Sequence, residues 1–177
     1  MNLKAKTILT RAKIQIILTE PFWASLLLKL EFDEDVSAPT MWTDGTRVGY
    51  NPDFVIGLAP EELMGVLAHE VGHCILLHTT RRAGRNGRRW NIACDYSLNH
   101  VIEEGGFRLP ESRLRKPEYD RLSCDQVYEL LSEELPLGSQ ESDPGGCGEV
   151  REVESGSERE RLSAEWKLAA ATAAASA

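Results

Sequence analysis

Apolar residues recur at helical spacing near the N-terminus and again in the middle of the chain. Residues 3–18 mix apolar and basic side chains at this spacing, and Pro21 follows soon after, so we expect a first helix that ends near Thr19. Pro60 and the two acids after it are typical of a helix start, and the apolar run over residues 63–77 predicts a second helix. The same spacing predicts two later helices, over residues 90–104 and from the capping residue Ser123 to about Leu135.

A shorter period indicates strands between the first two helices. Residues 28–33 alternate apolar and polar side chains, which is typical of a half-buried strand. Residues 41–43 and 47–50 flank Asp44 and Gly45, a dipeptide that accepts the positive φ angles of a tight turn, so we expect a hairpin. Helices that follow a small antiparallel or mixed sheet place the chain in the α+β class.

The composition changes after residue 135. Residues 136–161 are rich in Gly, Ser, Glu and Pro, which bury too little apolar area to offset the entropy lost on ordering. Residues 162–177 are rich in alanine and prone to form a helix, but no capping signal ends them. We therefore expect one domain over residues 1–135, a flexible linker or loop over 136–161, and a helical, truncated-looking segment over 162–177.

The second predicted helix contains His69, Glu70 and His73 in the pattern H-E-x-x-H. Residues four apart lie on one face of a helix, so both imidazoles can reach one metal ion, and Glu70 lies beside them, where it can take a proton from water. The surrounding residues are apolar on almost every side, which predicts a buried helix. A bound cation compensates the burial of all three polar groups, which a chance His and Glu in an ordinary helix would leave without partners.

A catalytic zinc site has three protein ligands and an open position, so a third ligand has to come from elsewhere in the chain. Asp95 is our candidate, because it falls at the margin of the apolar face of the helix predicted over residues 90–104. The alternative is a structural carboxylate paired with the arginines of residues 81–89 or with a backbone end. Glu103 and His100 are the reserve ligands.

His78 is a further histidine close to the motif, five residues after His73. If the helix persists, it lies about 140° round the helix from His73 and points away from the ion. We therefore interpret His78 as structural, in contact with the hairpin or with the helix over residues 90–104.

Charge and cysteine content narrow the possible partners and the compartment. The formal net charge is −8, which argues against wholesale binding to nucleic acid or to an anionic membrane, and the arginines of residues 81–89 fit a solvated loop that balances nearby acids. Four cysteines without a C-x-x-C pair, and no uninterrupted signal-peptide core or membrane span, predict a cytoplasmic protein. A thiolate at Cys147, among glycines, is a candidate ligand for the open metal position and would silence the enzyme there.

These residues resemble a known family, the metallopeptidase domain that precedes a von Willebrand A-like (VWA-like) domain in bacterial and phage proteins. The resemblance covers roughly residues 3–110, and its matching segments are residues 40–45, 50–52, 69–73 with His78, 81–82 and 90–95 with Asn99. It implies a zincin-like fold, with the active-site helix packed on the small sheet, and it makes Asp95 an expected polar site. The VWA-like half is missing from this chain, which fits a truncation or a reduced phage version.

The sequence thus predicts a zinc metallopeptidase in which His69, His73 and Asp95 bind Zn²⁺ and Glu70 is the general base. The expected substrate is a peptide or protein held as an added strand at the edge of the hairpin. The alternative is a catalytically silent zinc module that partners an AAA-type ATPase, a VWA-like domain or a phage assembly. Glu70 favours the enzyme, because a structural zinc site needs no base beside it.

Overall fold

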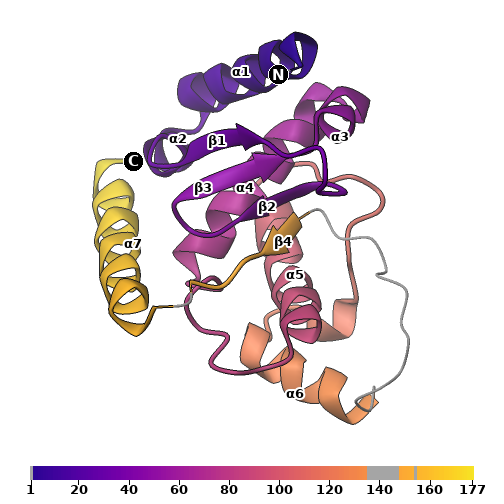
Figure 1. The fold of residues 1–177 in the computed structure, drawn as a ribbon, viewed down its shortest axis with the longest axis vertical. Helices are drawn as coiled ribbons and strands as arrows, with labels where there is room; N and C mark the ends of the chain where they lie inside the picture. Colours follow the sequence, from indigo (N-terminus) through magenta and orange to yellow (C-terminus); the bar gives the residue numbers. More distant parts are fainter. Residues whose placement is uncertain (1, 135–147, 154) are drawn as a thin grey trace.

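The computed structural model describes residues 2–134, 148–153 and 155–177. Helices make up most of this part of the chain, and a small sheet lies along one side of them (Figure 1). The helices are α1 (Leu3–Thr19), α2 (Pro21–Leu27), α3 (Pro52–Gly57), α4 (Pro60–Ile75), α5 (Gly87–Glu104), the 3₁₀ turn η1 (Pro117–Tyr119), α6 (Cys124–Glu134) and α7 (Gly156–Ser176). The strands are β1 (Glu31–Glu34), β2 (Met41–Thr43), β3 (Arg47–Tyr50) and β4 (Gly148–Val150).

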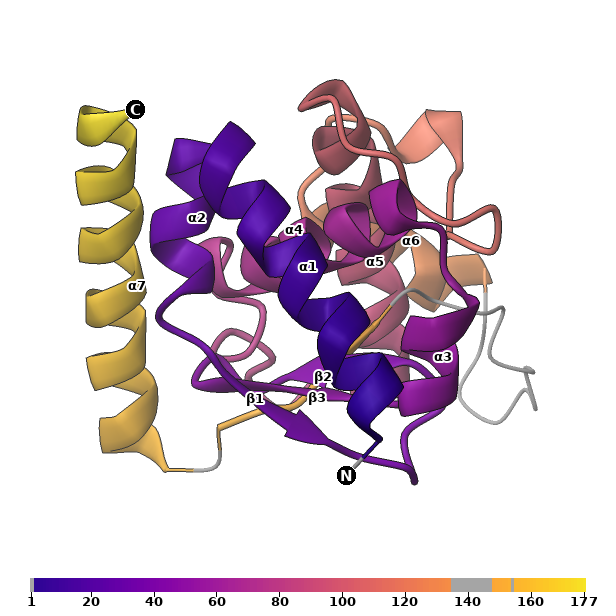
Figure 2. The same cartoon turned by 90° about the horizontal axis from the view of Figure 1, so that it is seen from above.

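The four strands form one mixed sheet in the order β1-β3-β2-β4. The predicted hairpin is present: β2 and β3 are antiparallel, and Gly45 at their turn has a φ of 89°, which a residue with a side chain rarely adopts. β1 runs parallel to β3, and β4 runs parallel to β2 with Gly148 opposite Met41. In Figure 2 the strands lie along one side of the molecule and α2 and α4 lie on the other, while α1 crosses from that side toward the strands, so α4 covers one face of the sheet.

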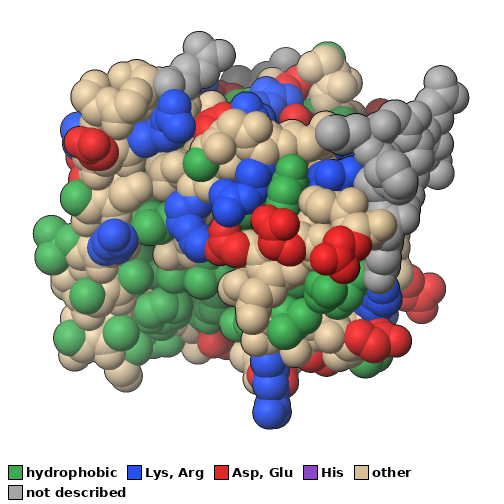
Figure 3. Space-filling model, turned by 90° about the horizontal axis from the view of Figure 1, so that it is seen from below, with side chains coloured by type: hydrophobic (Ala, Val, Ile, Leu, Met, Phe, Trp, Pro, Cys, Tyr) green, Lys and Arg blue, Asp and Glu red, His purple; other side chains and the backbone are tan. Residues whose placement is uncertain are grey.

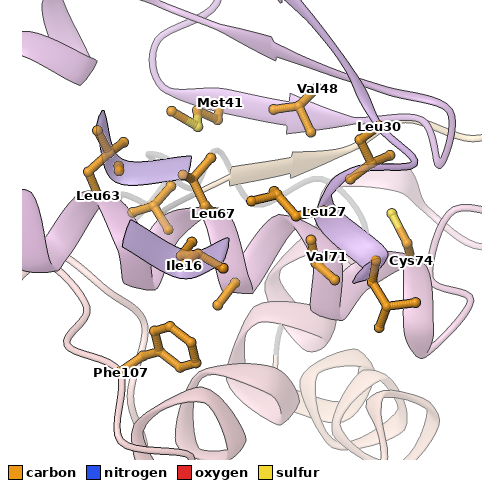
Figure 4. Packing of buried hydrophobic residues seen from close by; sticks show 14 of the residues in the cluster. Ile16, Leu27, Leu30, Met41, Val48, Leu63, Leu67, Val71, Cys74 and Phe107 are labelled. Atoms are coloured by element: carbon orange, nitrogen blue, oxygen red, sulfur yellow. The ribbon is translucent and has the colours of Figure 1, made fainter. Parts of the chain in front are cut away.

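The main core lies between α4 and the sheet (Figure 4). Leu63, Leu67 and Val71 follow one another at helical spacing along α4 and are at most 1% exposed. They pack toward Met41 and Val48 of the sheet, with α1 and α2 closing the core from the other side. Burial of several large apolar side chains against α4, each worth about 1.5–3 kcal/mol, holds this helix in a fixed place under the sheet.

The other end of the molecule has a core of its own, where α5 packs on α6 and on the chain between them. Its buried members are Ile92, Ala93, Leu114, Tyr119, Val127 and Leu131. Helix α5 therefore contacts α4 on one side and α6 on the other. This double contact fixes the position of α5 relative to α4.

Helix α7 packs against α2 and α4. Trp166 is 2% exposed, and its indole nitrogen donates a hydrogen bond to the Gly45 carbonyl oxygen at 2.8 Å, which joins α7 to the hairpin turn. The helix begins at Gly156, and β4 and the start of α7 both lie in the range predicted as a linker. The proposed division into 1–135, 136–161 and 162–177 stays a prediction, and Cys147 lies outside the described residues.

The α+β class and most of the predicted helices are confirmed. Two short helices were missed: α2, which begins at Pro21, and α3, which Asn51 caps by accepting hydrogen bonds from the backbone of Asp53 and Phe54. The first strand lies three residues later than predicted, because α2 extends to Leu27 and Leu30 joins the core. Among the described residues, no helix is both long and apolar enough to cross a membrane.

Gly65 allows α4 to lie directly on the chain that follows α5. A methyl group added at this position would meet the Arg108 carbonyl oxygen at 2.0 Å, and a backbone atom cannot rotate away. We expect Gly65→Ala to lower the free energy of unfolding by about 1–3 kcal/mol, despite the better helix propensity of alanine. Urea unfolding would measure the loss, with Gly57→Ala as the matched control because nothing lies within 4 Å of that position. Equal stability of the two variants would contradict this account of the packing.

Candidate metal centre

Three side chains from two helices meet beneath the sheet. His69 and His73 lie one turn apart on α4, and Asp95 faces them from α5. The two imidazole Nε2 atoms are 2.7 Å apart, and Asp95 Oδ1 lies 3.5 Å from Nε2 of His69 and 3.3 Å from Nε2 of His73. The structure thus brings together the three residues that the sequence predicts as metal ligands, and all are fully buried.

The spacing of these three atoms fits a tetrahedral metal ion. Ligand atoms about 2.0–2.1 Å from a zinc ion at tetrahedral positions lie about 3.3–3.4 Å apart. The observed separations of 2.7, 3.3 and 3.5 Å scatter around that value. Two imidazoles and a carboxylate are also a ligand set typical of zinc sites that keep one position open.

The unpartnered polar atoms of the cluster point to the same conclusion. Among the described residues, Oδ2 of Asp95, both carboxylate oxygens of Glu70 and Nδ1 of His69 are buried without a hydrogen-bond partner. Buried polar groups without partners cost free energy, and four in one place are unusual for a native core. A cation bound between the Nε2 atoms and Asp95 would compensate the carboxylates.

Glu70 is next to His69 on α4, and its side chain reaches the sheet at β4. A methyl group built on Gly148 would lie 2.1 Å from Glu70 Oε1, so the backbone of β4 runs directly against this carboxylate. Burial raises the pKa of Glu70 well above its usual value, and the charges of Asp95 and Glu149 add to the effect. A carboxyl group with a raised pKa beside a metal cluster is suited to accept and return a proton.

His73 and Asp95 are in the protonation states that bind a metal ion. Burial lowers the pKa of His73 to about 4, with a smaller contribution from His69, so the imidazole is neutral at pH 7. Burial raises the pKa of Asp95, but the neighbouring imidazoles outweigh burial and lower it overall, so the carboxyl group is ionised. Neutral imidazole and ionised carboxylate are the forms that coordinate a metal.

The end of α4 brings a third histidine to this cluster. The amide of His78 donates to the His73 carbonyl oxygen at 2.9 Å and the amide of Leu77 to that of Cys74 at 3.1 Å, the pair of bonds that defines a Schellman cap. Leu77 has a φ of 59°, in the left-handed region that usually requires glycine. This turn folds the chain back, so that Nδ1 of His78 lies 2.9 Å from Nδ1 of His73. The condition under which His78 was expected to point away, a helix that persists beyond it, is not met, because the helix ends at Ile75.

Trp90 holds His78 in this position. Its indole nitrogen donates to the His78 carbonyl oxygen at 3.0 Å, and its ring packs edge-on against the His78 ring. The expected contact with the helix over residues 90–104 is thus present. His78 also forms a second group with Cys94 and Cys124, in which the potential ligand atoms lie within 4.8 Å of one another.

Proton positions decide between the two possible roles of His78. If His73 offers the lone pair of Nε2 to a metal, its proton is on Nδ1 and is donated to Nδ1 of His78. His78 then carries its own proton on Nε2, which leaves that nitrogen no lone pair for a second metal. The arrangement favours His78 as the residue that fixes the tautomer of His73, as outer partners of metal-binding histidines commonly do.

We expect His78→Ala to weaken zinc binding by about 10- to 100-fold, the usual effect of losing such a partner. His78→Asn should recover part of the affinity, because its side-chain oxygen can accept the proton of His73. Competition with a chromophoric chelator would measure the dissociation constants. His100→Ala is the matched control, since His100 is also buried but accepts from the Arg121 amide on the far side of α5. Equal losses in the His78→Ala and His100→Ala variants would refute the specific role of His78.

The reserve ligands lie outside the cluster. Glu103 forms ion pairs with Arg113 and Arg115, and His100 accepts a hydrogen bond from the backbone of Arg121. Sequence reasoning assigned no role to Asn91, although this residue precedes Asp95 by one helical turn and therefore lies on the same face of α5. Its side chain contacts β4 beside the cluster.

The arginines of residues 81–89 form a network with nearby acids. Arg81 and Arg85 both pair with Asp125 at the start of α6, and Arg82 pairs with Glu152 after β4 at 2.5 Å. These contacts are what a loop that balances neighbouring acids would make. Figure 3 shows the same mixture on one face of the molecule, where basic and acidic side chains lie next to each other and no histidine is visible.

A buried H-E-x-x-H helix beneath a small sheet, with a carboxylate from the next helix, is the arrangement of a metal-dependent hydrolase. The chain belongs to the family described as "Putative metallopeptidase domain", whose model matches residues 4–176. No curated protein and no solved structure matches it. Membership of this family indicates a peptidase-like function that uses a metal.

Proposed function

We propose that this domain is a zinc-dependent peptidase in which His69, His73 and Asp95 hold the metal and Glu70 is the general base. The observation that carries the proposal is the convergence of two Nε2 atoms and Oδ1 of Asp95, with separations of 2.7–3.5 Å, beside a buried carboxylate without a partner. A site that needed only a structural metal would have no use for that carboxylate.

The chain's own residues have distinct roles in this proposal. When bound, zinc supplies a Lewis acid that polarises the scissile carbonyl and favours ionisation of water. His78 keeps the proton of His73 on Nδ1, so that Nε2 faces the centre. Glu70 accepts the proton of the attacking water and passes it to the nitrogen of the leaving amine.

A second candidate, a catalytically silent zinc module, is favoured by the closure of the centre. His69, Glu70, His73 and Asp95 are each 0% exposed, so a substrate cannot reach them in this conformation. A peptidase with this structure has to open before it cleaves. A silent module would stay closed and act through a partner.

Partners and compartment follow from the same proposal. The substrate is a peptide or protein, and a VWA-like domain or an AAA-type ATPase is the proposed partner that would open or carry the domain. The cysteines at positions 74, 94 and 124 are buried free thiols, which supports a reducing, cytoplasmic environment.

Metal analysis and cleavage assays on the same preparations would test the proposal. We expect one zinc per wild-type chain and none in His69→Ala, together with cleavage of a proteome-derived peptide library by the wild type alone. If the protein binds zinc but cleaves no peptide, even in variants that release β4 from the centre, the silent module is favoured. A wild-type chain that takes up no zinc after supplementation would refute both candidates.

A further inference from the structure

Strand β4 covers the candidate centre with the chain's own backbone. It pairs in parallel with β2, and Gly148 lies directly against Glu70, where even a methyl group would approach Oε1 to 2.1 Å. In Figure 1 β4 lies between β2 and α5, and β4 contacts both α4 and α5, the helices that carry the metal-binding residues. Glycine is therefore the residue that fits at position 148, because any side chain there would clash with Glu70.

Asn91 binds the other edge of this strand. Its Nδ2 donates to the Gly148 carbonyl oxygen at 3.2 Å, and its Oδ1 accepts from the Val150 amide at 2.7 Å. These are the two bonds that a neighbouring strand would make to the same edge, so the carboxamide stands in for a strand. β4 is thus held on both sides, by the main chain of β2 and by a side chain four residues before Asp95.

Residues after β4 are anchored independently of the centre. The guanidinium of Arg151 lies 3.8 Å from the centre of the Trp42 ring, and the Arg151 amide donates to the Thr43 carbonyl oxygen at 2.9 Å. Glu152 pairs with Arg82 and Arg159. The part of the strand over Glu70 can therefore leave while residues 151 and 152 keep their contacts.

We propose that the space between β2 and Asn91 is a binding slot for an extended peptide, and that residues 148–150 are its internal occupant. The slot recognises main-chain groups through β2 and Asn91, and it takes glycine at the position facing Glu70. That the competing external ligand is a substrate rests on the proposed peptidase function. The expected edge for strand addition, at the hairpin, is occupied in this conformation by β4.

The accessibility of the two histidines in the metal-free protein tests this proposal. Carbethoxylation by diethyl pyrocarbonate, mapped by mass spectrometry, would report how often His69 and His73 are exposed, with buried His100 as the internal reference. Asn91→Ala removes two hydrogen bonds from β4, and Gly148→Ala forces the strand away from Glu70. We expect both to raise the rate at His69 and His73 relative to His100 by about tenfold or more.

The controls separate release of the strand from general loosening. Gly156→Ala adds a methyl group where nothing lies within 4 Å and should leave the ratio unchanged. Asn91→Asp keeps an acceptor for the Val150 amide but turns a carboxylate oxygen toward the Gly148 carbonyl oxygen, so it also weakens the hold on β4 and allows the measurement if Asn91→Ala does not fold. Ratios equal to wild type in the folded Asn91 and Gly148 variants would overturn the proposal. Because no metal or substrate is used, this result is independent of whether the domain is a peptidase.

Discussion

Replacing Asp95 with alanine should weaken zinc binding by about 100- to 4,000-fold, while the fold of the metal-free protein persists. Removal of one member of a buried charged group typically costs about 3–5 kcal/mol, which corresponds to this range in affinity. The loss is expected because Asp95 is the only carboxylate among the described residues whose oxygen lies within 3.5 Å of both Nε2 atoms. Isothermal titration or chelator competition with zinc would measure it.

Glu103→Ala is the matched control for this variant. Glu103 lies on the same helix and was the reserve ligand, but it pairs with Arg113 and Arg115 at the helix end. Its removal should lower stability slightly through the lost ion pairs and leave zinc affinity unchanged. Zinc affinity that depends on Glu103 and not on Asp95 would show that the conformation of α5 in solution differs and that the ligand assignment is wrong.

The sequence predicted the helix that carries His69, Glu70 and His73 because the information is local. The apolar run, Pro60 and the acids after it specify α4 without reference to the rest of the chain. Asp95 could also be predicted, since its place on the apolar margin of α5 follows from helical periodicity alone. Helical periodicity does not predict whether α5 packs against α4 or against another element, because this depends on contacts between segments that are distant in the sequence.

The remaining contacts of the site depend on backbone features that sequence patterns describe poorly. Leu77 adopts a left-handed conformation that its side chain disfavours, so nothing in the sequence signals the turn that returns His78 to His73. β4 is three residues long, within a segment of linker-like composition, and forms because β2 and Asn91 supply its hydrogen bonds. Its glycine is required by Glu70, a residue 78 positions earlier in the chain.

These features share one physical cause, which is the need to surround polar groups in a buried site. Where Glu70, His73 and Asp95 are removed from water, each neighbouring group has to be placed to a fraction of an ångström, and the chain accepts strain at Leu77 to achieve this. The departures from simple sequence rules at the candidate centre therefore have a physical cause in the burial of its polar groups.

Glu70→Gln should abolish cleavage while the centre still binds zinc. Loss of a positioned general base typically lowers the rate by about 10²- to 10⁴-fold, and glutamine preserves the shape of the side chain. Steady-state kinetics on any peptide that the wild type cleaves would measure the loss, with zinc content determined on the same sample. Glu61→Gln, at an exposed position of the same helix, should behave as wild type. Wild-type rates in the Glu70→Gln variant would remove Glu70 from the mechanism.

The same substitution should stabilise the metal-free protein, and increasingly so as the pH rises. Burial raises the pKa of Glu70, so above about pH 4.5 the native state retains a proton that the unfolded chain has lost, and stability falls with rising pH until the native pKa is passed. Glutamine does not titrate, so its advantage should be small at pH 5 and should grow as the pH rises toward 8.

His73 contributes the opposite slope to both proteins. Its pKa is lowered from 6.5 to about 4, so the unfolded chain binds more protons in that window and stability is lost as the pH falls through it. Burial, His69 and Asp95 set that pKa, so the effect cancels when wild type and Glu70→Gln are compared at one pH. Urea unfolding of both chelator-treated proteins from pH 5 to 8 would therefore measure the contribution of Glu70 to the free energy of unfolding. A difference between the two proteins that does not change with pH would show that the Glu70 carboxyl group has a compensating partner in the metal-free protein.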